Sequence, residues 1–483
     1  MINNIYKSFK KIKVAGTGII ICVVALAIAS CGSKGLGDVS SPDLQDTSTT
    51  GTKKPSTPSK PSSPDKQNPE AKFFTVTFDS DGGSSYPAMD VEEGGKALLP
   101  SGVFKTIPGL HKGPTGTFSP DGWYNGDTKW NFNNAINADI TLIAKYPSPI
   151  DVSDRLGGNI VEKAVSYIKG SVVYDDGYTL VLDKNVDIAP QALKDNVIKL
   201  GIIGLGGVRT IGLSGDGALF TVGDNNKPLN KVDFTLGENI TLRGKTGNID
   251  AVVSINSSSA TFRMQSGSKI TGNTINISGN TAEKPINKAA AVEVINGIFI
   301  MEGGEISGNS SSKESKGYGF YATPSAVAIY KDGTFTMMGG SIYGNEGGVA
   351  EIAYNVNPNH GVFSLSGNAR IKSVVMVYEG HLLWPERSIV IADWNMDFDK
   401  KIELNLSANT KGGGEDQISE VLSKFRDSKY PLLNVEALGD TGKDAIGRFQ
   451  LEKYYNHITT GGADIPSSHY ISTSGNNIGK LVR

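Results

Sequence analysis

Apolar and polar residues alternate along the middle of the chain in units that repeat. The three clearest units contain Phe-x-Met, at Phe262, Phe299 and Phe335, and two weaker units contain Phe-x-Leu, at Phe234 and Phe363. The five phenylalanines are 28, 37, 36 and 28 residues apart. Strict alternation over a few residues predicts half-buried strands, and a recurring period of roughly 20–50 residues predicts a repeat architecture.

Each clear unit predicts three short strands and one polar corner. An apolar pair precedes each phenylalanine, and an isoleucine and an asparagine follow it. The asparagines, Asn273, Asn309 and Asn345, are 36 and 36 residues apart. Asn296-Gly297 and Asp332-Gly333 are turn signals between the apolar pair and the phenylalanine.

Stacked coils of short strands account for this repeat. Each coil exposes unpaired backbone groups, which a neighbouring coil about 4.8 Å away satisfies while like residues are buried against each other. We therefore expect a parallel β-solenoid over residues 148–390, with the three asparagines stacked at one corner. The repeat resembles the right-handed parallel β-helix of pectate-lyase-like domains, which also occurs in exported lipoproteins, including treponemal ones. An up-and-down antiparallel structure is the alternative.

The ends of a solenoid need covers for its apolar core. A helical pattern over residues 151–169 is the expected N-terminal cap, and Gln191–Lys199 is expected as a second short helix. Tyr178–Leu182 predicts a strand, and Leu219–Val222 predicts a first coil. The repeat degrades beyond the solenoid, where residues 391–483 are expected to form further coils and a C-terminal cap.

Residues 71–147 carry a separate pattern of four blocks. Phe74, Val76 and Phe78 alternate with threonines before Asp-Gly-Gly, and Gly-Trp-Tyr, Trp-Asn-Phe and Ile-Thr-Leu-Ile-Ala-Lys follow. These blocks, in this order, resemble the internalin-type B-repeat, also called the Listeria–Bacteroides repeat. The resemblance implies a small β-grasp-like module of surface proteins. The insert Lys105–Phe118 is longer than the family pattern.

The N-terminal residues have the organisation of an export signal. Lysines precede an apolar run, and small residues then lead directly to Cys31. Ile28-Ala29-Ser30-Cys31 resembles the bacterial lipoprotein signal, which implies that the Cys31 thiol is lipidated and becomes the mature N-terminus. An ordinary signal peptide or an N-terminal membrane helix is the alternative. Residues 1–30 are thus the expected signal, and the Ser-, Pro- and Lys-rich residues 31–70 are an expected disordered tether.

The composition argues against binding to nucleic acid and against stabilisation by an internal disulfide. Removal of the signal removes four lysines and no acidic residue. The mature chain therefore has 43 basic and 49 acidic residues and a net charge of −6. Without a basic block, binding to nucleic acid is not expected. The two cysteines are Cys22, inside the signal, and Cys31. The mature chain therefore cannot form an internal disulfide.

The sequence offers little catalytic chemistry, and we expect no cofactor and no metal. No two of its histidines have the spacing of a metal site; they are His111, His360, His381, His457 and His469. The best acidic cluster is Asp393, Asp397 and Asp399, which flanks Trp394-Asn395-Met396 and is expected to be a solvated loop. Trp123 and Trp130 are expected in the core of the module, although aromatic residues also stack on ligands.

Two insertions follow stacked asparagines and are expected to leave the solenoid on the same side. One, Ser310–Pro324, carries Tyr318, Phe320 and Tyr321, which we take as a candidate partner-binding loop because aromatic residues are enriched at binding hot spots. The other is Glu346–His360. Packing of the three aromatic side chains against the solenoid is the alternative.

These features predict a lipid-anchored exported protein on a bacterial outer membrane or cell surface. Its expected role is non-catalytic binding, adhesion or scaffolding, with a host protein or glycan as partner. A carbohydrate-active β-helix enzyme, either a polysaccharide lyase or a glycosidase, is the alternative, and it would require two or three carboxylates gathered on one solenoid face. The fold alone does not choose between them.

The lipid site is tested by metabolic labelling with palmitate. Replacing Cys31 by Ala or Ser should abolish incorporation of the label, because only this thiol follows the small residues of the signal. Unchanged labelling of the variants would exclude Cys31 as the site of lipidation.

Overall fold

The structure is a computed structural model that describes much of the chain after residue 69. The described residues are 70–171, 175–275, 288–311, 324–355, 362–378, 389–394, 401–408 and shorter pieces between 422 and 482. Glu70–Arg483 form one compact unit. This part is all-β and contains a parallel β-helix, which confirms the predicted fold class and excludes the antiparallel alternative for the repeats. The signal, Cys31 and the tether lie outside the described residues.

The β module is a mixed five-stranded sheet, ordered β2-β1-β8-β6-β7. Its strands are β1 (Phe73–Asp79), β2 (Met89–Glu92), β6 (Gly122–Asn125), β7 (Thr128–Lys129) and β8 (Ile140–Lys145). β1 pairs parallel with β8, whereas the other pairs are antiparallel. The Phe78 ring meets Trp123 edge to face at 5.2 Å, and Trp130 packs against the same core. Both tryptophans thus contribute to packing, as expected.

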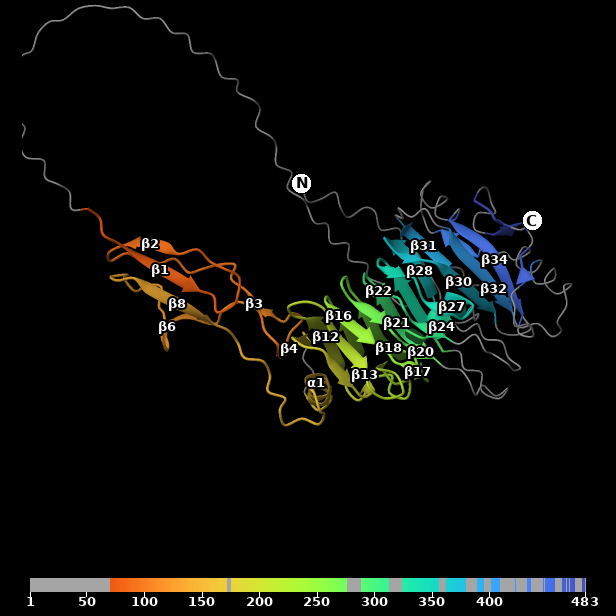
Figure 1. The fold of residues 1–483 in the computed structure, drawn as a ribbon, viewed down its shortest axis with the longest axis horizontal. Coiled ribbons are helices and arrows are strands. Elements are labelled where there is room, and N and C mark those ends of the chain that lie inside the picture. The colour runs from red at the N-terminus through yellow and green to blue at the C-terminus, as the bar shows by residue number, and fades with distance from the viewer. Residues whose placement is uncertain are drawn as a thin grey trace, which may run out of the picture. The chain divides into compact units, whose positions relative to one another are not determined.

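Three parallel sheets form the β-helix, and Figure 1 shows their strands stacked in chain order. The longest sheet has seventeen strands: β4 (Gly109–Lys112), β9 (Tyr178–Leu182), β11 (Gln191–Leu193), β12 (Ile198–Gly204), β14 (Phe220–Val222), β15 (Val232–Leu236), β18 (Val253–Met264), β21 (Val292–Met301), β24 (Pro324–Met337), β27 (Ala350–Asn355), β28 (Val362–Gly367), β30 (Ser373–Tyr378), β31 (Ile389–Trp394), β32 (Ile402–Ala408), β33 (Leu433–Val435), β34 (Phe449–Asn456) and β35 (Ala463–Asp464).

The two shorter parallel sheets close the coils. The seven-stranded sheet consists of β10 (Val186–Ile188), β13 (Arg209–Leu213), β16 (Ile240–Arg243), β19 (Lys269–Thr271), β22 (Glu305–Ile306), β25 (Ser341–Ile342) and β29 (Arg370–Ile371). The four-stranded sheet consists of β17 (Thr246–Asn248), β20 (Thr274–Ile275), β23 (Ser310–Ser311) and β26 (Glu346–Gly347). Two antiparallel pairs lie outside them: β3 (Lys105–Thr106) with β5 (Thr117–Phe118), and β36 (Tyr470–Ile471) with β37 (Leu481–Val482).

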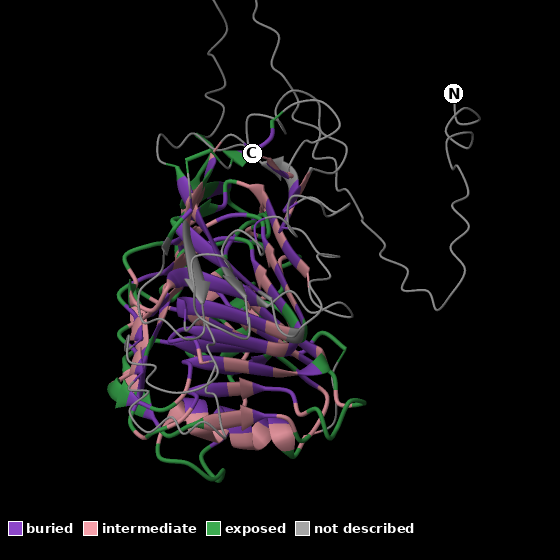
Figure 2. Ribbon diagram, turned by 90° about the vertical axis from the view of Figure 1, so that its right-hand side faces the viewer, coloured by how far each residue is buried: buried purple, intermediate pink, exposed green. Residues whose placement is uncertain are grey.

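A ladder of phenylalanines runs through the core of the solenoid. Its members are fully buried, in the order Phe220, Phe234, Phe262, Phe299, Phe335 and Phe363. Neighbouring ring centroids are 4.5–5.4 Å apart. The rings of Phe299 and Phe335 lie 4.5 Å apart at an interplanar angle of 6°, which confirms that these residues are stacked neighbours one coil apart. Figure 2 shows the buried strands of successive coils lying one above another.

The asparagines form a hydrogen-bonded ladder at one corner, as predicted. The backbone N–H of Asn273 donates to Oδ1 of Asn309 at 3.2 Å, and Nδ2 of Asn309 donates to Oδ1 of Asn345 at 3.0 Å. The ladder also includes Asn248, whose Nδ2 donates to Oδ1 of Asn273. Because Asn248, Asn273 and Asn309 are almost fully buried, each amide must find partners inside the protein.

The structure differs from the local predictions at several points, among them the predicted insertion Glu346–His360, in which Ala350–Asn355 form the solenoid strand β27. The turn at Asn296-Gly297 is a bend inside the continuous strand β21, and a Cβ on Gly297, whose φ is +109°, would collide with the Ser257 and Ala260 carbonyl oxygens. A fourth short strand follows the asparagine in each clear unit, where β20, β23 and β26 pair. The predicted helix over Gln191–Lys199 is wrong, because pairing of β11 with β14 extends the backbone and buries Leu193.

The cap helix predicted over residues 151–169 forms over its second half, as α1 (Ile160–Lys169). Its apolar face, with Val161, Ala164, Val165 and Ile168, is buried in the core of the solenoid. Asn159 and Glu162 form a capping box that satisfies the first N–H groups of the helix. Within the described residues, no helix is long and apolar enough to span a membrane.

The long insert of the module also covers the solenoid. Its strand β4 pairs antiparallel with β9, the first strand of the long sheet, and Leu110 is fully buried in the solenoid core. The Thr179 hydroxyl donates to the Gly113 carbonyl at 2.8 Å. The insert therefore protects the backbone edge of the first coil.

The inward and outward positions of β24 differ in their expected contribution to stability. Phe335→Ala should lower the free energy of unfolding by about 3–5 kcal/mol, because it removes a ring stacked on both sides. Thr336→Ala should cost less than about 1 kcal/mol, because the half-buried Thr336 hydroxyl loses only the hydrogen bond that Ser364 donates. Chemical denaturation measures both values, and equal losses would contradict the inward position of Phe335.

Candidate functional site

Most candidates from the sequence lie outside the described residues. These are Cys31, Tyr318, Phe320, Tyr321, Asp397 and Asp399. Asp393 lies on β31, but its side chain is not among those described. The described residues therefore do not test the acidic cluster or the aromatic loop, and their roles stay predictions.

His111 has a structural environment. Its ring is 3% exposed, its Nε2 atom is 2.9 Å from the Ile107 carbonyl oxygen, and its ring lies 4.6 Å from that of Phe118. Burial lowers the pKa of His111 against two opposing backbone hydrogen bonds. Over the part of the chain that the structure describes, no group of three or more His, Cys, Asp or Glu is arranged to hold a metal ion.

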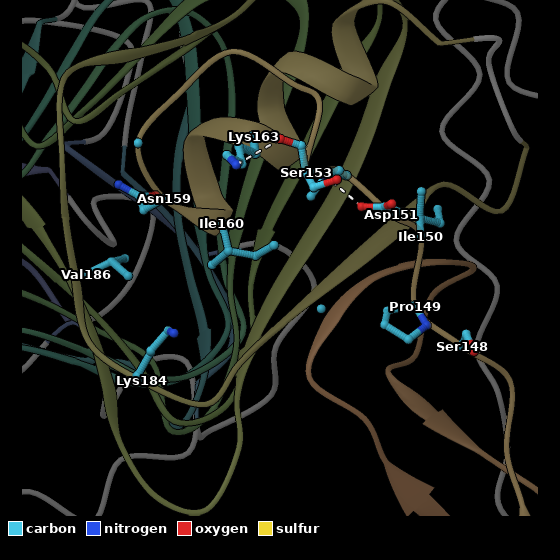
Figure 3. Close-up of a pocket in the computed structure, with 13 residues that line it drawn as sticks. Ser148, Pro149, Ile150, Asp151, Ser153, Asn159, Ile160, Lys163, Lys184 and Val186 are labelled. Carbon is cyan, nitrogen blue, oxygen red and sulfur yellow. Dashed lines mark hydrogen bonds between the residues drawn. The ribbon is translucent and has the colours of Figure 1, made fainter.

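One cavity lies where the segment after the module meets α1; we call it the cap cavity. Its volume is about 650 Å³, and its apolar wall includes Pro149, Ile150, Val152, Ile160 and Val186. Figure 3 shows polar side chains around this wall, with hydrogen bonds joining one segment of it to the helix.

The polar groups at the cap cavity hold its walls together. Lys163 Nζ donates to the Ser153 carbonyl at 3.0 Å, and the Ser153 N–H donates to Asp151 Oδ1 at 2.9 Å (Figure 3). The Glu162 carboxylate accepts the N–H groups of Gly158 and Asn159. Because the capping box occupies these donors, the helix end is not an open cradle for an anion.

A second cavity, the edge cavity, lies where the seven-stranded sheet ends. β29 is the last strand of that sheet, whereas the long sheet continues through β32 and β34. The resulting step has a volume of about 660 Å³ and is lined by Ser341, Ile342, Tyr343, Gly344, Arg370, Ile371, Lys372, Lys401 and Glu403. The backbone N–H of Glu403 donates to the Lys372 carbonyl at 3.0 Å and joins two walls of the step.

The edge cavity has a cationic lining. Arg370, Lys372 and Lys401 are exposed, and of these cations Lys372 also interacts with the buried carboxylate of Glu351. Glu403 carries the one carboxylate among the lining residues. The lining therefore has an excess of positive charge although the whole mature chain is acidic, and it suits an anionic ligand.

Two buried carboxyl groups lie outside both cavities. Glu293 is 5% exposed, and burial raises its pKa to about 8, with Lys288 lowering and Asp250 raising it more weakly. Glu351 is 2% exposed, and burial raises its pKa against hydrogen bonds from Asn345. A raised carboxyl pKa is typical of catalytic acids, but neither residue lines the cap cavity or the edge cavity.

Comparisons of the chain with protein-family models, with curated proteins and with solved structures give no match.

The residues of the edge cavity were not selected from the sequence. Arg370 and Lys372 flank Ile371 in the last weak repeat, and Lys401 follows about thirty residues later. The signal that could have found them is the position of two cations on either side of a repeat isoleucine, because alternate residues of a strand share a face. The contribution of Lys401 depends on how β32 pairs with β30.

Glu293 should make stability depend on pH. Its folded-state pKa is raised from 4.5 to about 8, so the protonated carboxyl favours folding at low pH, and this contribution is lost as pH rises through 8. Between pH 4.5 and pH 8, the free energy of unfolding should therefore fall by at most about 5 kcal/mol. When the free energy of unfolding is measured by denaturation at several pH values in this range, its dependence on pH should be weaker for Glu293→Gln. The exposed-site control Glu346→Gln should keep the wild-type dependence. Equal pH dependence in both variants would contradict this role.

Proposed function

We propose that this chain is an exported, lipid-anchored binding protein whose solenoid holds an anionic ligand at the edge cavity without converting it. The observation that carries the proposal is the cavity lining. Three exposed cations line a concave step on a scaffold whose core residues are stacked and buried.

The lining favours binding over glycoside cleavage. Hydrolysis of a glycosidic bond commonly uses two carboxyl groups, one as acid and one as base or nucleophile. Of the residues that line the edge cavity, Glu403 supplies one carboxylate, and the remaining charges are positive. Positive charges would attract an anionic ligand and raise its rate of association.

The N-terminal sequence supports the location. A signal over residues 1–30, the lipid site Cys31 and the Ser- and Pro-rich tether favour a folded head outside a bacterial membrane, on a spacer that lets it reach a ligand. The four blocks of the β module resemble the B-repeats of surface proteins, which fits the same location.

A charge-reversal experiment tests binding at this cavity. The full chain, extracted in detergent, should be retained on dextran sulfate at low salt and not on neutral dextran. Arg370→Glu with Lys401→Glu should reduce retention about tenfold or more, because two attractive charges become repulsive. The control, Lys184→Glu with Lys231→Glu, changes net charge equally at exposed sites outside the cavity and should bind like the wild type. Equal losses in both double variants would refute the site.

A further inference from the structure

Tyr343 presents an exposed aromatic ring at the edge cavity. It directly follows β25, and half of its surface, 50%, is exposed. Its backbone N–H donates to the Ile306 carbonyl at 3.2 Å, which ties it to the preceding coil. The ring is thus exposed on a backbone that its neighbouring coil holds in place.

The asparagine ladder holds the backbone of the same residue. Nδ2 of Asn345 donates to the Tyr343 carbonyl at 3.2 Å and to the Ile306 carbonyl at 2.9 Å. The Asn345 backbone N–H donates in turn to Oε1 of Glu351 at 3.1 Å. The last asparagine of the ladder therefore fixes the position from which the ring projects.

The cations lie on strands that place them beside this ring. Arg370 pairs in register with Ser341, two residues before Tyr343, and its backbone N–H donates to the Gly340 carbonyl at 2.9 Å. Lys372 follows on the same strand end, and Lys401 precedes β32 on the other wall. All of them line one cavity with Tyr343.

We infer that the edge cavity binds a saccharide that carries sulfate or carboxylate groups. Resting on the proposed function, this inference names its ligand class. The Tyr343 ring stacks on the C–H face of a sugar, and the cations pair with the anionic substituents. The Glu403 carboxylate accepts a hydrogen bond from a sugar hydroxyl.

Other anions match the cavity less completely. A free sulfate or phosphate ion would use the cations and leave the ring without a partner. A single-stranded DNA would use both, but its internal sugars carry no free hydroxyl to donate to the carboxylate of Glu403. A saccharide matches the ring, the cations and the carboxylate together.

Calorimetric titration of the full chain in detergent tests the ligand class. The probes are a heparin-derived sulfated tetrasaccharide, a guluronate tetrasaccharide, neutral cellotetraose, inorganic sulfate and an oligothymidylate of eight nucleotides. At least one anionic tetrasaccharide should bind tenfold or more tightly than cellotetraose, inorganic sulfate and the oligonucleotide. The two anionic tetrasaccharides distinguish sulfate from carboxylate as the recognised group.

Two variants of Tyr343 separate stacking from charge. Tyr343→Ala should weaken binding of the anionic tetrasaccharide about tenfold, whereas Tyr343→Phe, which keeps the ring, should stay within about threefold of the wild type. Unchanged melting temperatures would show that both variants fold. Wild-type binding by Tyr343→Ala, or preference for sulfate ion or the oligonucleotide, would overturn the inference. Retention on dextran sulfate that still depends on Arg370 and Lys401 would then leave the proposed function standing.

Discussion

Registered stacking of one coil on the next is the interaction on which the rest of this structure depends. From β12 to β34, the described strands of the solenoid find their backbone partners mainly in neighbouring coils, often far away in the chain. The same register that pairs N–H with C=O also sets Phe299 against Phe335 and Asn309 against Asn345. Burial of like residues and satisfaction of backbone groups are therefore one constraint, because a slip of one residue would turn every ring outward.

Such a stack must end without leaving an open edge, and the chain solves this with short elements. The first strand, β9, pairs antiparallel with β4 from the insert of the module, and β34 pairs antiparallel with β35. The two residues that cap α1 also bind the backbone at β10. Asn159 donates to the Asp187 carbonyl, and Glu162 accepts the Ala189 N–H. The seven-stranded sheet ends at β29, where the step that forms the edge cavity remains.

The sequence predicts what is periodic and misses what depends on distant pairing. The Phe and Asn ladders, the cap helix and the module core follow from local patterns of apolar residues. The strands at Gln191–Leu193 and Gly109–Lys112 carry weak local signals and form because β14 and β9 offer partners. The edge cavity has the same origin: Tyr343, Arg370 and Lys401 come together because their coils stack, and no motif links them. For Tyr318 and the acidic cluster, the predictions stand as the sequence made them.

The equal spacing of Asn273, Asn309 and Asn345 has a consequence for how such a chain can change its length over evolution. Each of these coils offers its neighbours almost the same surfaces: a phenylalanine ring, a methionine, an isoleucine and an amide. Duplication or loss of one 36-residue segment within a gene would leave every remaining ladder in register. A change of length inside a strand would break the ladders, whereas the loops between strands tolerate it, since the stacked phenylalanines are 28 to 37 residues apart. Whole coils and their loops are therefore the units by which descendants of this protein can grow or shrink.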